Sequence, residues 1–97
     1  MFVRLTIAKF KPGASNEIKR VYQEGVSSLA GTQKGYIKTY LLINYKENKV
    51  ISVAFWESEE DAVASEQSGH YHEQMSKAKH LLASVPVSEG YEVAMEK

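Results

Sequence analysis

The chain has 97 residues, of which 43% are hydrophobic, enough for the core of one domain but too short a chain for two. Its twelve Lys and Arg residues balance twelve Asp and Glu residues, which argues against binding to nucleic acid or to an anionic membrane. Cysteine is absent, which excludes disulfides, thiolate metal sites and cysteine nucleophiles. No segment has the roughly 20 apolar residues of a membrane span, and the N-terminus resembles a strand more than a signal peptide. We therefore expect a single domain over residues 1–97 in a soluble, cytoplasmic protein.

The spacing of apolar residues predicts four strands and two helical regions. Residues 2–10 alternate between apolar and polar and end at a Lys-Pro-Gly turn, as a first strand would. Residues 14–30 carry apolar side chains at helical spacing and are followed by a glycine that suits a helix cap. Residues 36–45 and 49–57 are two β-rich runs joined by a polar spacer of hairpin length. They are expected to pair as antiparallel strands.

A second helical region follows the third predicted strand. Ser58 is a good helix cap, and the acidic residues after it favour the N-terminal end of a helix dipole. We expect this helix to break near Ser68 and Gly69, to resume with apolar residues at helical spacing, and to end at Pro86. Residues 87–96 are expected to form the fourth strand.

The resulting βαββαβ order is typical of an α+β, ferredoxin-like fold, in which an antiparallel sheet carries its helices on one face. Strand alternation leaves the other face strongly apolar. Monomers rarely expose an apolar patch larger than about 300–600 Å², so we expect this face to pack against a second copy in a twofold homodimer. The predicted dimer face consists of Val3, Leu5, Ile7, Ile37, Leu41, Ile43, Ile51, Val53 and Phe55.

The face beneath the helices is predicted to contain a small-molecule pocket. Alternation assigns to it Arg4, Thr6, Ala8, Tyr40, Ser52, Ala54 and Trp56. Small side chains beside aromatic rings favour an apolar hollow with a few polar groups, which is how ligand sites are usually built. Arg4 and Tyr40 are candidates for binding an anionic or phenolic group, although an arginine in such a place often packs its stem on apolar surface and keeps its head in water.

Three segments carry a resemblance to a known family. They are Gly35-Tyr36 at the start of the second predicted strand, the run Phe55–Glu60 after the third, and Ser68-Gly69-His70-Tyr71 in the second helical region. Together they resemble the antibiotic biosynthesis monooxygenase family of dimeric α+β barrels, over nearly the whole chain. This resemblance implies the homodimer and a substrate site in each subunit.

Characterised members of this family differ in chemistry. Some oxygenate polyphenols or quinols without a metal or prosthetic group, some degrade haem, and some bind or isomerise small carbonyl compounds. The haem-degrading pattern implies Asn, Trp and His at the positions of Thr6, Ser65 and Met75, and this mismatch argues against haem degradation. The polyphenol oxygenase pattern implies Asn and Tyr at the positions of Ser52 and Ala62, and of this set only the tryptophan is present, as Trp56.

Trp56 and His70 are the catalytic candidates, and each has a second interpretation. Trp56 could simply fill the core, as aromatic residues at strand ends usually do, or its ring and N–H could orient an oxygenated aromatic ligand. His70 matches the histidine of the family, and imidazole is suited to act as a general base or as a donor to a substrate oxygen near neutral pH. Alternatively, His70 stabilises the helix break by bonding a backbone group.

The sequence therefore predicts a pocket whose lining residues are Arg4, Thr6, Tyr40, Ser52, Trp56, His70 and Tyr71. The leading hypothesis is cofactor-independent oxygenation of a small quinol-like or polyphenolic compound, with dioxygen as the second substrate. The alternatives are a small-molecule binding or stress-response protein, an isomerase of small carbonyl compounds, and a structural module whose pocket is packed shut. No metal site is predicted, because the segment after His72 lacks the second histidine that a zinc-protease helix places four residues on.

Overall fold

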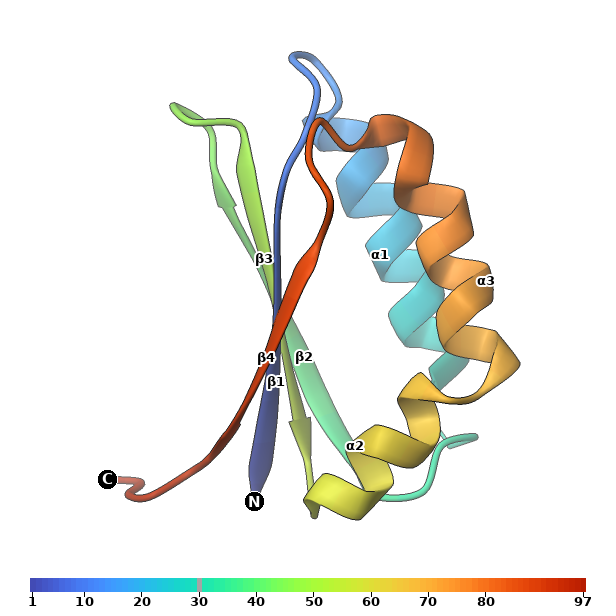
Figure 1. Ribbon diagram of the computed structural model, residues 1–97, viewed down its shortest axis with the longest axis vertical. Coiled ribbons are helices and arrows are strands. Elements are labelled where there is room, and N and C mark those ends of the chain that lie inside the picture. Colours follow the sequence, from blue (N-terminus) through green and yellow to red (C-terminus); the bar gives the residue numbers. More distant parts are fainter. Residues whose placement is uncertain (30) are drawn as a thin grey trace.

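The computed structural model describes residues 1–29 and 31–97, and for Leu29, His70 and Tyr71 it describes the backbone alone. The elements are β1 (Phe2–Lys9), α1 (Ser15–Leu29), β2 (Tyr36–Asn44), β3 (Lys49–Trp56), α2 (Glu59–Glu66), α3 (Gly69–Ala78), the 3-10 turn η1 (Lys79–Leu81) and β4 (Val87–Glu92). In this part of the chain the strands form an antiparallel sheet in the order β2-β3-β1-β4. All the helices lie on one side of the sheet (Figure 1). This is the α+β, ferredoxin-like fold that the sequence predicts.

The element boundaries agree with the prediction except near the C-terminus, and the predicted last residue of the first helix, Ala30, lies outside the described residues. The predicted break near Ser68 is confirmed, because α2 ends just before it and α3 begins just after it. The helical segment ends at η1, well before Pro86, since Leu82 has an extended backbone and forms an isolated β-bridge with Phe10. β4 is also shorter than predicted and ends at Glu92, the residue that pairs with the first residue of β1.

The prediction for the two faces of β2 was wrong. Leu41 pairs with Ser52 and Tyr40 pairs with Val53, so Leu41 faces the helices and Tyr40 faces away from them. Ile43 likewise packs against the core beneath the helices. Two features explain the error: the apolar run at the centre of β2 does not alternate, and a register irregularity lies near its start. A shift of one residue exchanges the two faces of a strand.

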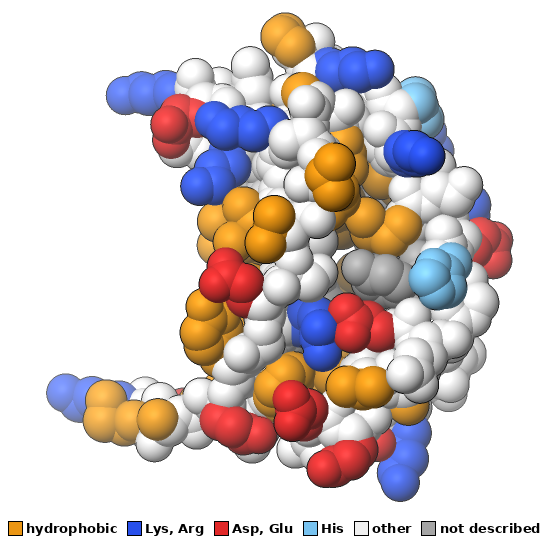
Figure 2. Space-filling view, viewed as in Figure 1, with side chains coloured by type: hydrophobic (Ala, Val, Ile, Leu, Met, Phe, Trp, Pro, Cys, Tyr) orange, Lys and Arg blue, Asp and Glu red, His pale blue; other side chains and the backbone are white. Residues whose placement is uncertain are grey.

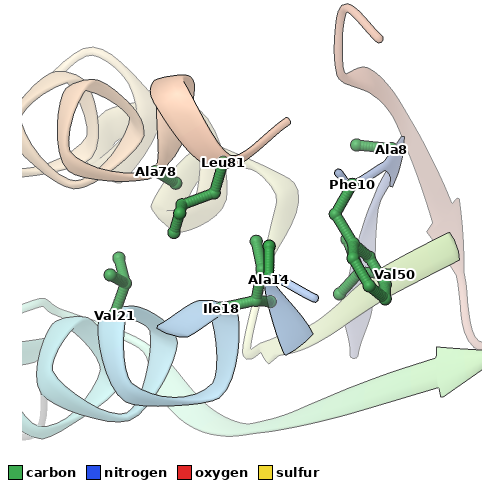
Figure 3. Close-up of a cluster of buried hydrophobic side chains, with 8 residues drawn as sticks. All are labelled: Ala8, Phe10, Ala14, Ile18, Val21, Val50, Ala78 and Leu81. Carbon is green, nitrogen blue, oxygen red and sulfur yellow. The ribbon is translucent and has the colours of Figure 1, made fainter. Parts of the chain in front are cut away.

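Among the described residues, buried hydrophobic side chains form two clusters between the sheet and the helices. The first cluster, drawn in Figure 3, consists of Ala8, Phe10, Ala14, Ile18, Val21, Val50, Ala78 and Leu81. The second consists of Phe2, Trp56 and Ala62, with Tyr36 and Ala54 packed against it. Because Phe2 and Phe10 lie at and just beyond opposite ends of β1, the two clusters occupy opposite ends of the sheet.

The other side of the sheet, which we call the open face, is largely apolar and is covered by nothing within the described chain. Its apolar residues are Val3, Leu5, Ile7, Tyr40, Leu42, Ile51, Val53, Phe55, Val87 and Tyr91. Figure 2 shows hydrophobic side chains gathered along this concave side of the molecule. The charged Lys38 lies over the Phe55 ring, with its Nζ atom 5.0 Å from the ring centroid. The Tyr91 hydroxyl donates a hydrogen bond to Glu89 at 2.6 Å, which raises the pKa of Tyr91.

No helix in the described part of the chain is both long and apolar enough to cross a bilayer. The cytoplasmic location and the homodimer stay predictions from the sequence.

The start of α2 depends on a cap by Ser58, whose Oγ accepts a hydrogen bond from the Asp61 backbone N–H at 3.2 Å. We expect Ser58→Ala to lower the free energy of unfolding by about 1 kcal/mol, because it leaves a backbone N–H of the first turn without its partner. Urea unfolding followed by circular dichroism measures this change. Ser27→Ala, at an exposed position within α1, is the matched control and should change stability by less than about 0.5 kcal/mol. Equal losses in both variants would contradict the capping role.

Candidate functional site

A cavity of about 130 Å³ lies between the sheet and the helices. Its sheet wall is formed by Arg4, Thr6, Thr39, Ser52, Ala54 and Trp56. Its helix wall comes from α1, α2 and α3 and includes Gly25, Ala62, Ser65, Glu66, Gln74 and Met75. Since the lining also includes members of both hydrophobic clusters, the cavity occupies the gap between them.

The gap lies over the part of the two central strands where three helix-facing residues are short. Thr6 pairs with Ser52 across β1 and β3, and the next helix-facing position on β3 is Ala54. Large side chains at the two ends of the sheet support the helices, while the short ones between them do not reach across. Apolar cavities of about 150 Å³ can hold one benzene ring. The size of this cavity therefore suits a single aromatic ring.

Trp56 has a clear packing role. Only 5% of its surface is exposed, and it forms the second hydrophobic cluster with Phe2 and Ala62. Its ring meets that of Tyr36 edge to face, with centroids 5.5 Å apart and an interplanar angle of 72°. Trp56 also lines the cavity, so the packing interpretation is compatible with the ligand-orienting one.

An ion pair between Arg4 and Glu66 forms the polar part of the cavity wall. Arg4 Nη1 lies 2.8 Å from Glu66 Oε1, and the two side chains are 17% and 28% exposed. The guanidinium carbon also lies 5.6 Å from the centroid of the Phe2 ring. Gly90, which pairs with Arg4 from β4, leaves room for the Phe2 ring, because a Cβ atom at this position would lie 2.5 Å from Phe2 Cζ. These contacts hold a cationic group in place beside an otherwise mostly apolar hollow.

The structure brings together four of the residues that the sequence places in the pocket, namely Arg4, Thr6, Ser52 and Trp56. Tyr40 is not among them: it lies on the open face, is 52% exposed, and packs edge to face against Phe55. Its assignment to the pocket was therefore wrong, because the apolar run of β2 does not alternate and its register shifts near the start of the strand. The side chains of His70 and Tyr71 lie outside the described residues, so their roles stay predictions.

Several positions that the family resemblance compares with catalytic or iron-binding residues also line this cavity. They are Thr6, Ser52, Ala62, Ser65 and Met75. These positions therefore lie together in the cavity wall, although their residue types differ from those of the haem-degrading and polyphenol-oxygenating patterns. Among the described lining residues there is no imidazole that could bind a haem iron. Within the same part of the chain, no three His, Asp or Glu side chains are grouped closely enough to hold a metal ion.

Sequence reasoning missed Glu66, Gln74 and Gly25 as cavity residues. Glu66 is one of several acidic residues in α2, and its position at the end of that helix gives no signal by itself. Gln74 looks like an ordinary polar residue of α3 in the sequence. Gly25 did carry a signal, because a glycine inside a helical pattern usually has a packing or functional reason.

Residues 1–77 match the family model described as Antibiotic biosynthesis monooxygenase. The chain belongs to this family. No curated protein matches it by sequence. Membership of the antibiotic biosynthesis monooxygenase family confirms the resemblance stated from the sequence.

Solved structures share this fold at low sequence identity. A protein from Caulobacter crescentus, named as a candidate antibiotic biosynthesis monooxygenase, is 13% identical with a TM-score of 0.84, over 97% of this chain and 90% of that chain. One from Nitrosomonas europaea with the same kind of name is 14% identical with a TM-score of 0.82, over 96% and 89%. Rv0793 from Mycobacterium tuberculosis is 12% identical with a TM-score of 0.80, over 98% and 96%. At these identities the similarity establishes the fold alone.

A substitution that fills the cavity should remove ligand binding without lowering the free energy of unfolding. We expect Ala54→Leu to abolish the binding of phenol, because the added methyl groups occupy the space of one ring, while stability stays equal or rises by about 0.5–2 kcal/mol. Phenol titration followed by NMR and urea unfolding measure the two quantities. Ala64→Leu, the same substitution at an exposed position of α2, should change neither. Undiminished phenol binding in Ala54→Leu would show that phenol binds outside the cavity.

Proposed function

We propose that the protein is a cofactor-independent monooxygenase that converts a small hydroxyarene of the quinol or polyphenol type to a quinone. The observation that carries this proposal is a mostly apolar cavity, large enough for one aromatic ring, with Trp56 and the Arg4 guanidinium in its wall. An apolar hollow with a few fixed polar groups is how proteins usually bind aromatic ligands. Family membership supports the choice of oxygenation.

The chemistry needs only a substrate, dioxygen and a place to move one proton. His70 accepts the phenolic proton, and the Arg4 guanidinium stabilises the phenolate that forms. The phenolate gives one electron to dioxygen, and the resulting superoxide bonds to a ring carbon that carries hydrogen. The peroxide then loses water, with cleavage of the O–O bond, and leaves a second carbonyl. A hydroxyarene and one O₂ thus give a quinone and one H₂O, and the substrate supplies all four electrons.

The protein contributes position and exclusion of water in this scheme. Enclosing the ring between sheet and helices holds its oxygen near Arg4 and keeps bulk water from the anion. A more open groove between α1 and β2 shares Tyr22, Val26 and Thr39 with the cavity. A substrate with more than one ring can therefore place its reacting ring in the cavity and the remainder in the groove.

We also propose that the protein works as a homodimer through the open face. The large apolar surface supports this, because a monomer would leave it in water. Lys38 and Glu89 lie on the outer strands β2 and β4, so the charges flank an apolar centre formed by β1 and β3. A polar rim around an apolar centre is typical of stable interfaces.

Oxygen uptake by the protein in the presence of a metal chelator tests the proposed reaction. With hydroquinones and hydroxynaphthalenes as substrates, we expect saturable uptake above the rate of autoxidation. His70→Ala should lower kcat by about 100-fold or more, because it removes the proton acceptor, and Trp56→Phe should change mainly KM. Uptake no faster than autoxidation with every substrate would favour a binding protein or a carbonyl isomerase, since neither consumes oxygen.

Sedimentation tests the dimer independently of activity. Val53 pairs with Leu5 on one side and with Tyr40 on the other, which places it near the middle of the open face. We expect the unaltered protein to sediment as a dimer at micromolar concentration and Val53→Lys to sediment as a monomer, because it buries an unpaired charge in the interface. Val85→Lys, the same substitution at a residue that is 84% exposed, should remain a dimer. A monomeric unaltered protein would contradict the proposal.

A further inference from the structure

Gln74, on the helix wall of the cavity, has a side-chain oxygen in an unfavourable place. Its Oε1 atom is buried and has no hydrogen-bond partner among the described residues. A buried acceptor without a donor costs free energy, and an apolar side chain of similar length would avoid that cost. Gln74 is also the residue of α3 that meets Gly25 on the facing helix α1.

Gly25 provides the space that the Gln74 amide occupies. A Cβ atom at this position would lie 2.7 Å from Gln74 Oε1 and 3.1 Å from its Cδ. Gly25 is buried in the middle of α1, where glycine is a poorer helix former than alanine. Two locally unfavourable residues therefore meet at one contact, and both line the cavity. Such violations of local rules concentrate at functional sites.

We propose that Gln74 orients the substrate by accepting a hydrogen bond from a substrate hydroxyl. In the free protein the Gln74 side-chain amide occupies the space beside Gly25, which we call the notch. When a hydroxyarene enters, the amide turns towards the cavity, and Oε1 gives up no hydrogen bond to any described residue. This inference rests on the proposed function and adds a specificity determinant to it.

The Arg4 guanidinium and Gln74 Oε1 lie on opposite walls of the cavity, and together they restrict the class of substrate that fits. Arg4 on the sheet wall can only donate hydrogen bonds, so it favours a phenolate or carbonyl oxygen. Although the Gln74 amide nitrogen can donate, the atom without a partner among the described residues is Oε1, which can only accept and so favours a hydroxyl over an ether or ketone. A ring with oxygen substituents at two positions, at least one of them a free hydroxyl, satisfies both walls. This description fits a dihydroxyarene better than a simple phenol.

The test compares 1,4-dihydroxybenzene with 1,4-dimethoxybenzene, which keeps both oxygen acceptors and lacks the donors. Binding is measured without oxygen by NMR titration of the unaltered protein, Gln74→Met and the control Gln67→Met, whose residue is exposed and outside the cavity. We expect the diol's advantage over the ether to fall about tenfold in Gln74→Met and to stay unchanged in Gln67→Met. We also expect Gln74→Met to unfold at the same temperature as the unaltered protein or at a higher one.

Two outcomes of this comparison would overturn the proposal. One is an unchanged preference for the diol in Gln74→Met. The other is a clear fall in the unfolding temperature of that variant, which would give Gln74 a structural role. Because oxygen is excluded, these results do not depend on whether the protein oxygenates its ligand, and oxygen uptake tests that separately.

Gly25→Ala provides a second test, which can be made even if Gln74→Met does not fold. The new methyl group displaces the flexible end of Gln74 from the notch. We expect the Gln74 side-chain amide resonances of the free variant to move towards their positions in the diol complex of the unaltered protein. Unmoved resonances would show that the notch does not hold the amide, and the proposal would be wrong.

Discussion

The short side chains at the centre of β1 and β3, on the side that faces the helices, are the constraint on which the rest of this structure depends. With Thr6 and Ser52 paired across the two central strands, the sheet cannot fill the space beneath the helices. The helices rest instead on a cluster at each end of the sheet, built around Ile18 and Trp56. The core is therefore divided, and the space between its halves becomes the cavity. A larger residue at Ser52 would join the halves and remove the site.

The interruption between α2 and α3 follows from the same geometry. A straight continuous helix could cover one end of the sheet but would not bring both Ser65 and Gln74 to the wall of one hollow. The chain turns at Ser68, whose backbone N–H and Oγ both donate hydrogen bonds to the Ser65 carbonyl at the end of α2, at 3.1 Å and 2.6 Å. Glu66, the last residue of α2, lies just before this turn and beside Arg4. The break in secondary structure therefore brings residues of both helices to the cavity wall.

The fold could be predicted from the sequence because its signals are local and agree with one another. The alternation of β1 and β3, the cap at Ser58 and the glycine after Ser68 each specify one element. The face of Tyr40 could not be predicted, because β2 is apolar on both sides and register depends on pairing with β3. Of the site, alternation found the residues of β1 and β3, but Glu66 and Gln74 meet the cavity only through the packing of helices. Such contacts leave no periodic signal in a single sequence.

Trp56 is the only tryptophan of the chain, and it belongs to one half of the divided core while also forming part of the cavity wall. Its fluorescence therefore reports on two events with a single signal. Loss of the packing around Phe2 and a change in cavity occupancy both alter the surroundings of the same indole ring. An optical melting curve recorded with ligand present would combine these contributions. Because of the divided core, Trp56 fluorescence responds both to unfolding and to ligand binding. The two responses can be separated only when ligand concentration and temperature are varied independently.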